Sequence, residues 1–282
     1  MIRNAALGLA SLLLLAAAPA QDKVRLEVRA KKGEKYSHTS KESNEGTITI
    51  EFGGQSIPQQ VLEKETKKYK DEILEVEGSL PSKIRRSFTE WTETKLPPGG
   101  AEPVEEKKTL HGKTLVLKKV GDKTEYEGAE GVPASELAKN RLKPDALLAT
   151  LPKEPVAPGA EWKLEEKLIL DEFKDDAGEE SQVEFTAARG TGRLERVEDH
   201  KGQKCGVIRI ALELDGRIKE QKDVKLKMDL KADFWLALDS GRPLTMKGGG
   251  TGDLAGEVDM DGNKVKFSGK FKFAQEGEQT YE

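Results

Sequence analysis

A long stretch of alternating apolar and polar residues constrains the fold of this 282-residue chain more than any other feature. From Val224 to Leu238 an apolar residue stands at every second position, and lysine or aspartate occupies most of the positions between. A helix would spread such residues over all of its faces, whereas a strand places one set in the core and the other in water. Because strands of parallel sheets are usually covered on both faces, one-sided alternation is typical of antiparallel sheet. The stretch predicts a long strand that bends or twists strongly to keep one face covered.

The rest of the C-terminal third has the same character. Apolar residues alternate again over 208–214 and 265–273, and turn-forming sequences lie at Asp239–Pro243 and Asp261–Asn263. Asp259–Asn263 also resembles the start of a calcium-binding loop, but the downstream glutamate is missing and strand sequence resumes at once. A tight hairpin turn is therefore the favoured interpretation, and the region predicts an antiparallel meander.

The first half of the chain resembles the second half loosely. Lys32–Tyr36 and Pro158–Trp162 each open an extended segment, with the same spacing between glycine and aromatic residue. This predicts two repeated β-units, over 21–132 and 159–282, joined by a proline-rich connection over 133–158. In the connection, Ala134–Leu142 and Asp145–Leu151 have the composition of short helices.

Two further segments complete the predicted architecture. Gln59–Val76 has a possible helical face, but its turn-flanked context favours a strand. Leu96–Pro103 is rich in proline and glycine and is expected to be a surface loop. The predicted fold is mainly β: a long, curved, half-barrel-like antiparallel sheet of two β-units, with one or two short helices in the central connection.

The first twenty residues have the features of a secretory signal peptide. Arg3 precedes an apolar stretch too short for a stable membrane span, and Ala18-Pro19-Ala20 is a small-residue cleavage site. Charged residues follow directly, and the position after the cleavage site is Gln21, not the cysteine of a lipoprotein. We expect cleavage between Ala20 and Gln21, and a soluble periplasmic or extracellular protein without an integral membrane anchor.

The sequence predicts no catalytic residue, no metal site and no cofactor. Gly250–Ala255 matches the spacing of a dinucleotide-binding loop, but strand sequence follows where that loop needs a helix, so glycines that relieve crowding in a bent strand or bulge are favoured. The three histidines are scattered and the lone Cys205 lies in a strand-like segment, where it is expected to be a small buried residue. Lysine and glutamate are interspersed at a net charge of −4, which predicts no nucleic-acid partner.

The alternation also supplies candidate contact residues. The apolar face of the predicted sheet would line any interior space; its candidate ligand-lining residues are Leu230, Phe234, Leu236, Phe267 and Phe271. Trp235 falls on the polar face of the same strand, where an outward tryptophan marks a candidate surface contact.

The chain resembles a family of exported bacterial β-rich proteins of unknown function. The resemblance rests on the signal peptide, the openings at Gly33/Tyr36 and Gly159/Trp162, and the run from Leu151-Pro152 through Val156 into the second opening. It covers most of the mature chain and implies no catalytic residues. At the level of fold, long curved strands with one apolar face are similar to the half-barrels of periplasmic lipoprotein carriers.

Three functional hypotheses follow. The first is an exported, non-enzymatic binding protein for a lipid or other apolar ligand held inside the curved sheet. The second is a structural or interaction module of the cell envelope with a filled core and an envelope protein as partner. The third is a hydrolase that uses surface carboxylates.

Overall fold

The computed structural model describes residues 22–97, 102–121, 123–142, 150–177, 182–221, 223–260 and 263–282. The predicted signal peptide and its cleavage site lie outside these residues, as do most of the predicted second helix of the connection and the tip of the predicted hairpin at 261–262. Within the described ranges, neither helix combines the length and the apolar character that crossing a bilayer requires.

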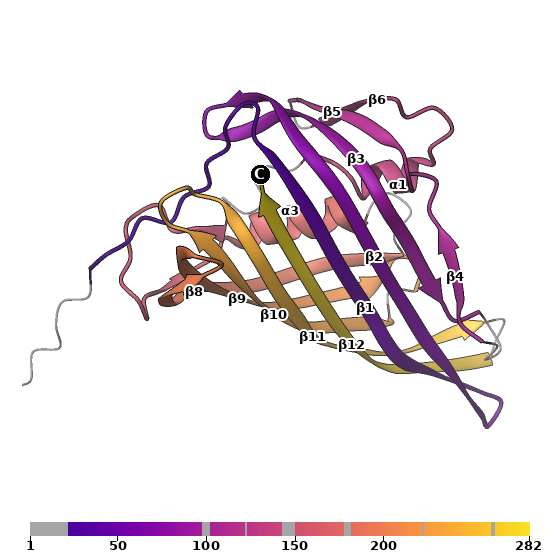
Figure 1. Cartoon of the computed structure of the whole chain (residues 1–282). Helices are drawn as coiled ribbons and strands as arrows, with labels where there is room; N and C mark the ends of the chain where they lie inside the picture. Colours follow the sequence, from indigo (N-terminus) through magenta and orange to yellow (C-terminus); the bar gives the residue numbers. More distant parts are fainter. Residues whose placement is uncertain are drawn as a thin grey trace, which may run out of the picture.

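Twelve strands form one antiparallel sheet that is curved and not closed, as the sequence predicted (Figure 1). The order across the sheet is β6-β5-β3-β2-β1-β12-β11-β10-β9-β8-β7, and β4 pairs with β3. The strands are β1 (Lys35–Phe52), β2 (Gln55–Glu77), β3 (Leu80–Lys95), β4 (Val104–Lys107), β5 (Thr114–Val120), β6 (Lys123–Glu127), β7 (Glu161–Lys163), β8 (Val183–His200), β9 (Gln203–Ile218), β10 (Lys225–Ala237), β11 (Pro243–Met260) and β12 (Asn263–Tyr281).

The alternating stretch forms β10, and its apolar set faces the concave side of the sheet. In register with β9, Leu230 lies opposite Leu212 and Phe234 opposite Ile208, so the inward positions of the two strands are apolar together. The segment 59–76, which has a possible helical face, lies wholly within β2, which confirms its interpretation as strand. The predicted hairpin is confirmed by the pairing of Met260 with Asn263 at the ends of β11 and β12.

The two halves of the chain share the sheet through the pairing of β1 with β12. Their openings also have the same geometry. Gly33 and Gly159 have φ of +81° and +85°, a conformation that glycine adopts without steric cost. The amide of Gly33 donates to the carbonyl of Ile73, and that of Gly159 donates to Leu194. A register shift follows directly after Ile73 and after Leu194, so each opening is anchored at a corresponding irregularity.

Two hydrophobic cores lie on the concave side. One is built under β8, β9 and β10 and includes Leu194, Ile208 and Leu236. The other is built under β2, β3 and β5 around Trp91, which has no exposed surface. Leu137 of α1 (Ala134–Ala138), the short helix of the central connection, packs against this second core.

The structure also contains a helix that the sequence analysis did not predict, outside the central connection. A further helix, α3 (Glu166–Ala177), follows β7 and lies within the concavity (Figure 1). Its Ile169, Leu170 and Phe173 have the i, i+1, i+4 spacing of one helical face and pack against the first core. The segment opened by Trp162 is therefore a strand of three residues followed by a helix, and this helix packs against β8.

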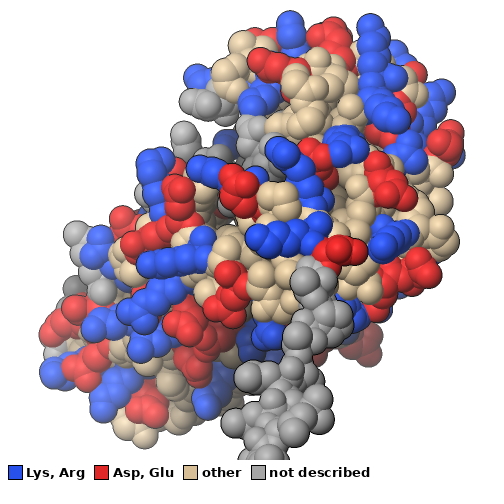
Figure 2. Space-filling model, turned by 90° about the vertical axis from the view of Figure 1, so that its left-hand side faces the viewer, with Lys and Arg blue, Asp and Glu red and all other residues tan. Residues whose placement is uncertain are grey.

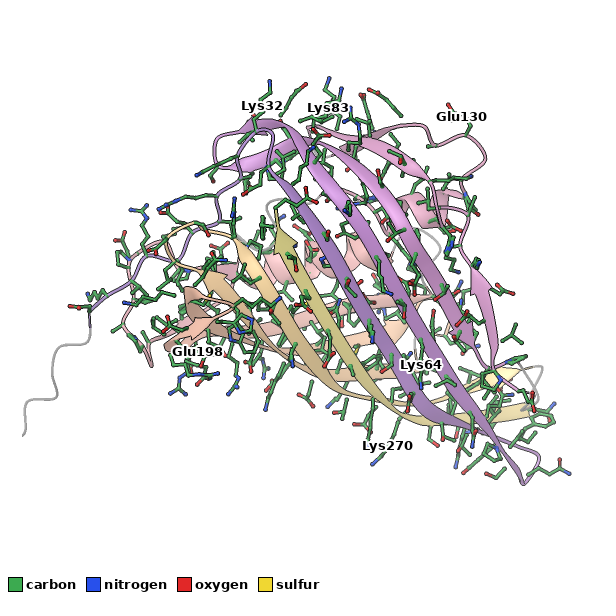
Figure 3. All side chains as sticks on the ribbon, viewed as in Figure 1. Lys32, Lys64, Lys83, Glu130, Glu198 and Lys270 are labelled. Carbon is green, nitrogen blue, oxygen red and sulfur yellow. The ribbon has the colours of Figure 1, made fainter. Side chains whose placement is uncertain are left out.

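The convex side of the sheet is polar. On β10, the outward-facing Lys225, Lys227 and Lys231 are exposed, and Lys270 of β12 projects away from the sheet (Figure 3). Seen from the left-hand side of Figure 1, the surface of the molecule mixes lysine and arginine with aspartate and glutamate (Figure 2). Small apolar contacts occur here too: Cys205, Ala237 and Leu244 form a minor buried cluster, and Cys205 is a free, buried thiol, as predicted.

The glycine-rich sequence at 250–255 lies inside β11, where a dinucleotide loop cannot form. The pairing of β10 with β11 runs in unbroken register from Lys225 to Trp235, so no bulge accounts for the glycines. A Cβ at Gly250 would overlap the carbonyl oxygen of Asp229 on the neighbouring strand. These glycines therefore permit close approach of strands in the curved sheet, which confirms the prediction that they relieve crowding.

Candidate functional site

A hollow of about 590 Å³ lies on the concave side, between the two cores. It is lined by inward-facing side chains of β1, β2 and β9 to β12, by Phe173 of α3, and by Lys139, which directly follows α1. Its volume falls in the range of about 300–1,000 Å³ that is usual for sites of small-molecule ligands.

The wall formed by β9, β10 and α3 is apolar. Its side chains are Phe173, Ile210, Leu212, Met228, Leu230 and Phe234. All of these belong to the first core or pack against it, and they are partly accessible except Ile210, which is buried. A ligand on this wall would therefore contact side chains that are packed from behind by the first core.

The floor of the hollow contains little side-chain volume. Gly248 and Gly249 of β11 and Ala232 of β10 line it, and Ala232 pairs with Gly248. A Cβ placed at Gly248 would lie 3.1 Å from the Cβ of Ala232, which is closer than ordinary contact. The small residues that permit the close strand approach therefore also leave space above the sheet.

The opposite wall, on β1 and β2, carries carboxylates. Glu42 pairs with Glu65, and Glu65 pairs with Glu93 of β3, so three carboxylates form one row across neighbouring strands. Like charges placed directly opposite destabilise a sheet unless they are compensated. Lys67 and Lys139 lie 3.2 and 3.3 Å from the two oxygens of Glu65.

Direct ion pairs with lysines are formed by Glu65 and Glu93, whereas Lys67 and Lys139 act on Glu42 only through their charge. Lys95 lies 3.0 Å from Glu93, and Lys108 also pairs with it. Burial acts to raise the pKa of Glu93, but hydrogen bonds from these two lysines lower it. Burial and the neighbouring Glu65 raise the pKa of Glu42 above its usual value.

Glu42 is open to the hollow and has one neutral hydrogen-bond donor. Gln275 of β12 donates from Nε2 to Glu42 Oε1 at 2.9 Å. In the described part of the chain no lysine or arginine forms an ion pair with Glu42. The hollow thus joins an apolar wall to a carboxylate that retains acceptor capacity.

A buried polar cluster lies on the same concave side, near the start of β1. Asp71 is bonded to Arg86 and to the hydroxyl of Tyr36, and His38 stacks on Tyr69 with ring centroids 4.7 Å apart. Burial and the charge of Arg86 lower the pKa of His38 to about 4. His38 is therefore neutral near pH 7, as a histidine packed beside a guanidinium should be.

The structure separates the predicted ligand-lining residues into three places. Leu230 and Phe234 line the hollow together. Leu236 is 1% exposed and lies inside the first core. Phe271 lines a different depression towards the β11–β12 hairpin, and Phe267 lies farther along the same inward face of β12, opposite Ile50.

Trp235 is half-buried on the outer side of the sheet. Its Nε1 donates to Glu198 Oε1 at 2.7 Å, its ring lies 5.4 Å from that of His200, and it packs on the minor cluster of Cys205. Glu198 itself lies at the outer surface (Figure 3). The indole is thus integrated into the outer face, with its polar atom satisfied.

Several site residues escaped the sequence reasoning. Glu42 and Glu65 lie on β1 and β2, where polar residues occupy inward positions and hide the alternation. Phe173 could have been found, because Ile169 and Phe173 are spaced i, i+4 and Lys167 pairs with Asp171 at the same spacing. Among the described residues, no three His, Cys, Asp or Glu side chains gather as a metal site.

Comparison with known proteins shows no matching family model and no matching curated protein. Several solved structures are similar to this chain at low identity. A lipovitellin structure on lipid–protein interactions is 7% identical over 86% of this chain and 25% of that chain, with a TM-score of 0.38. DynF of the dynemicin biosynthesis pathway of Micromonospora chersina is 10% identical over 91% of this chain and 85% of that chain, with a TM-score of 0.21. A DUF1329 family protein from Desulfovibrio piger is 9% identical over 82% of this chain and 83% of that chain, with a TM-score of 0.14.

This chain spans about a quarter of the lipovitellin chain that it matches. All three TM-scores are below 0.5, so these structures indicate nothing about the function of this chain.

Proposed function

We propose that this protein is an exported, non-enzymatic binding protein that holds an apolar or amphiphilic small molecule of the lipid class in the hollow of its half-barrel. The observation that carries the proposal is the hollow itself, about 590 Å³ in volume and walled on one side by apolar side chains of β9, β10 and α3. Burying apolar ligand surface against such a wall contributes roughly 25 cal/mol per Å² before the costs of association are subtracted.

The arrangement of the two cores supports binding over a purely structural role. A filled core would place Leu230 and Phe234 in contact with the opposite wall, whereas here both line open space. Leu236, which lies two residues after Phe234 on β10, is by contrast fully buried. The open space is thus a local feature of the middle of the sheet, flanked by well-packed regions.

Export follows from the predicted signal peptide and is part of the same proposal. A carrier in the periplasm or outside the cell would meet lipids of the envelope. The mixed charges of its convex surface suit a protein that is soluble in that compartment.

The experiment has two arms. Lipid extracted from the purified protein is identified by mass spectrometry, and binding of the neutral apolar dye N-phenyl-1-naphthylamine is measured by fluorescence. Leu230→Glu places a charge on the apolar wall and should weaken dye binding by about tenfold or more. Val120→Glu, at an apolar residue 43% exposed on β5 outside the hollow, is the matched control and should leave binding unchanged. Absence of both extracted lipid and saturable dye binding would refute the proposal.

A further inference from the structure

We infer that the polar end of the hollow selects an amphiphile with a positively charged, hydrogen-bond-donating head group of the alkylamine class, received by Glu42. The inference rests on the proposed function and specifies its ligand. Two observations support it: the charged side chains that line the hollow, and the ion pairs and hydrogen bonds that these side chains form.

The lining is acidic. Among the described residues that line it there are four glutamates and two lysines; the glutamates are Glu42, Glu63, Glu65 and Glu172. Of the two lysines, Lys231 has its place on the outer face in the alternation of β10 and is exposed there. Lys139 is the lysine on the inner side, and it lies between Glu65 at 3.3 Å and Glu93 at 3.9 Å. An anionic head group would have to compete with both carboxylates for this lysine.

Glu42 is placed differently from the other carboxylates of its row. Glu65 and Glu93 have lysine partners, whereas Glu42 accepts a hydrogen bond from the neutral amide of Gln275. An ionised carboxylate offers about four acceptor positions, so most of those on Glu42 are free for a ligand. A charge-assisted bond to an ammonium group is stronger than one to a neutral donor.

The neighbouring position adds to the excess of acceptors. Asn44, two residues farther along β1, also lines the hollow, and its carbonyl oxygen is buried without a hydrogen-bond partner in the part of the chain that the structure describes. A donor-bearing head group is what this end of the hollow lacks. With the head at Glu42, an alkyl chain can lie against Leu212, Leu230 and Phe234, which share the same hollow.

The test compares three probes with the same twelve-carbon chain: dodecylammonium, dodecanoate and dodecanol. Each is titrated at pH 7.5 against the full-length processed protein, by displacement of N-phenyl-1-naphthylamine. We expect dodecylammonium to bind about tenfold more tightly than dodecanoate, since a hydrogen bond to a charged group contributes on this scale. Glu42→Gln should remove the preference for dodecylammonium over dodecanoate.

The matched control is Glu276→Gln, which removes a carboxylate next to Gln275 on the exposed outer face of β12. This variant should retain the preference, and far-UV circular dichroism checks that both variants are folded. Dodecanoate binding as tightly as dodecylammonium, or a preference that survives Glu42→Gln, would overturn the inference while dodecanol binding upholds the proposed function. Failure of all three probes to bind would overturn both.

Discussion

Asp71 of β2 accepts two hydrogen bonds from Arg86 of β3, from Nε at 2.9 Å and from Nη2 at 2.8 Å. The hydroxyl of Tyr36 on β1 donates to the same carboxylate at 2.8 Å. The Asp71 side chain has no exposed surface and that of Arg86 is 12% exposed. The buried, bidentate ion pair thus joins β2 to β3 on the concave side, and the tyrosine hydroxyl joins β1 to the same carboxylate.

Asp71→Ala should destabilise the protein by about 3–5 kcal/mol, because it leaves the buried guanidinium without its partner. Replacing both partners, as Asp71→Leu with Arg86→Met, should cost less than the single change. Urea unfolding measures the three free energies. The control is Glu72→Ala, at the residue that follows Asp71. It breaks a largely exposed ion pair with Arg85 and should lower the free energy of unfolding by at most about 1 kcal/mol. Equal effects of Asp71→Ala and Glu72→Ala would contradict a structural role for the buried pair.

His38 should make the protein less stable in mild acid. Its pKa is lowered from 6.5 to about 4 by burial first and then by Arg86 and Lys67, with Asp71 acting in the opposite direction. A lowered pKa means that the contribution is present above pH 6.5 and is lost as the pH falls towards 4, by up to about 3 kcal/mol. His38→Phe keeps the stacking on Tyr69 and should flatten this part of the profile. Urea midpoints measured from pH 7.5 to pH 4.5 test it; identical profiles for both proteins would count against it.

The fold could be predicted from the sequence where one face of a strand is apolar. Over β10 the alternation is unbroken, so the strand, its inward face and its antiparallel partners follow from a single physical rule. The helix α3 was missed because Gly159 and Trp162, which precede it, have the same spacing as the glycine and the aromatic residue that precede and open β1. Only one strand residue follows Trp162 before the strand ends. Similar openings can thus lead to different elements when the later residues have different periods.

The site was less accessible to sequence reasoning. Leu230 and Phe234 were found because they continue the apolar alternation, but the same rule also selected Leu236, whose surroundings are filled. Whether an inward residue meets packing or space depends on what lies across the concavity, which no local pattern encodes. Glu42 looked like an ordinary surface residue because β1 mixes polar residues on both of its faces.

Gly250→Ala should destabilise the sheet by about 1–3 kcal/mol, since the added methyl group overlaps the backbone of β10 and the strands must separate. Thr251→Ala is the control, because Thr251 is the next residue on β11 and its side chain is exposed on the other face. Thermal unfolding should show a lower midpoint for the first variant and little change for the second. A midpoint for Gly250→Ala equal to that of the parent would show that the curvature does not need glycine there.

Binding of dodecylammonium should weaken as the pH is lowered. Burial raises the pKa of Glu42, with Glu65 contributing and Lys67 and Lys139 opposing, so this carboxylate takes up a proton at a higher pH than an ordinary glutamate. An alkylammonium remains charged throughout this range, so its attraction to Glu42 is lost as Glu42 is neutralised. Dye displacement at several pH values measures the effect, and Glu42→Gln should remove it. Affinity that rises on acidification would contradict the assignment.

The most direct test of the account is to fill the hollow and measure binding. Ala232→Trp adds a large side chain on the floor, where the paired Gly248 leaves room for it to extend into the open space. We expect saturable binding of N-phenyl-1-naphthylamine by the parent protein, and at least about tenfold weaker binding by the variant, with an unchanged circular dichroism spectrum. Unaltered dye affinity in the folded variant would show that the ligand does not occupy the hollow.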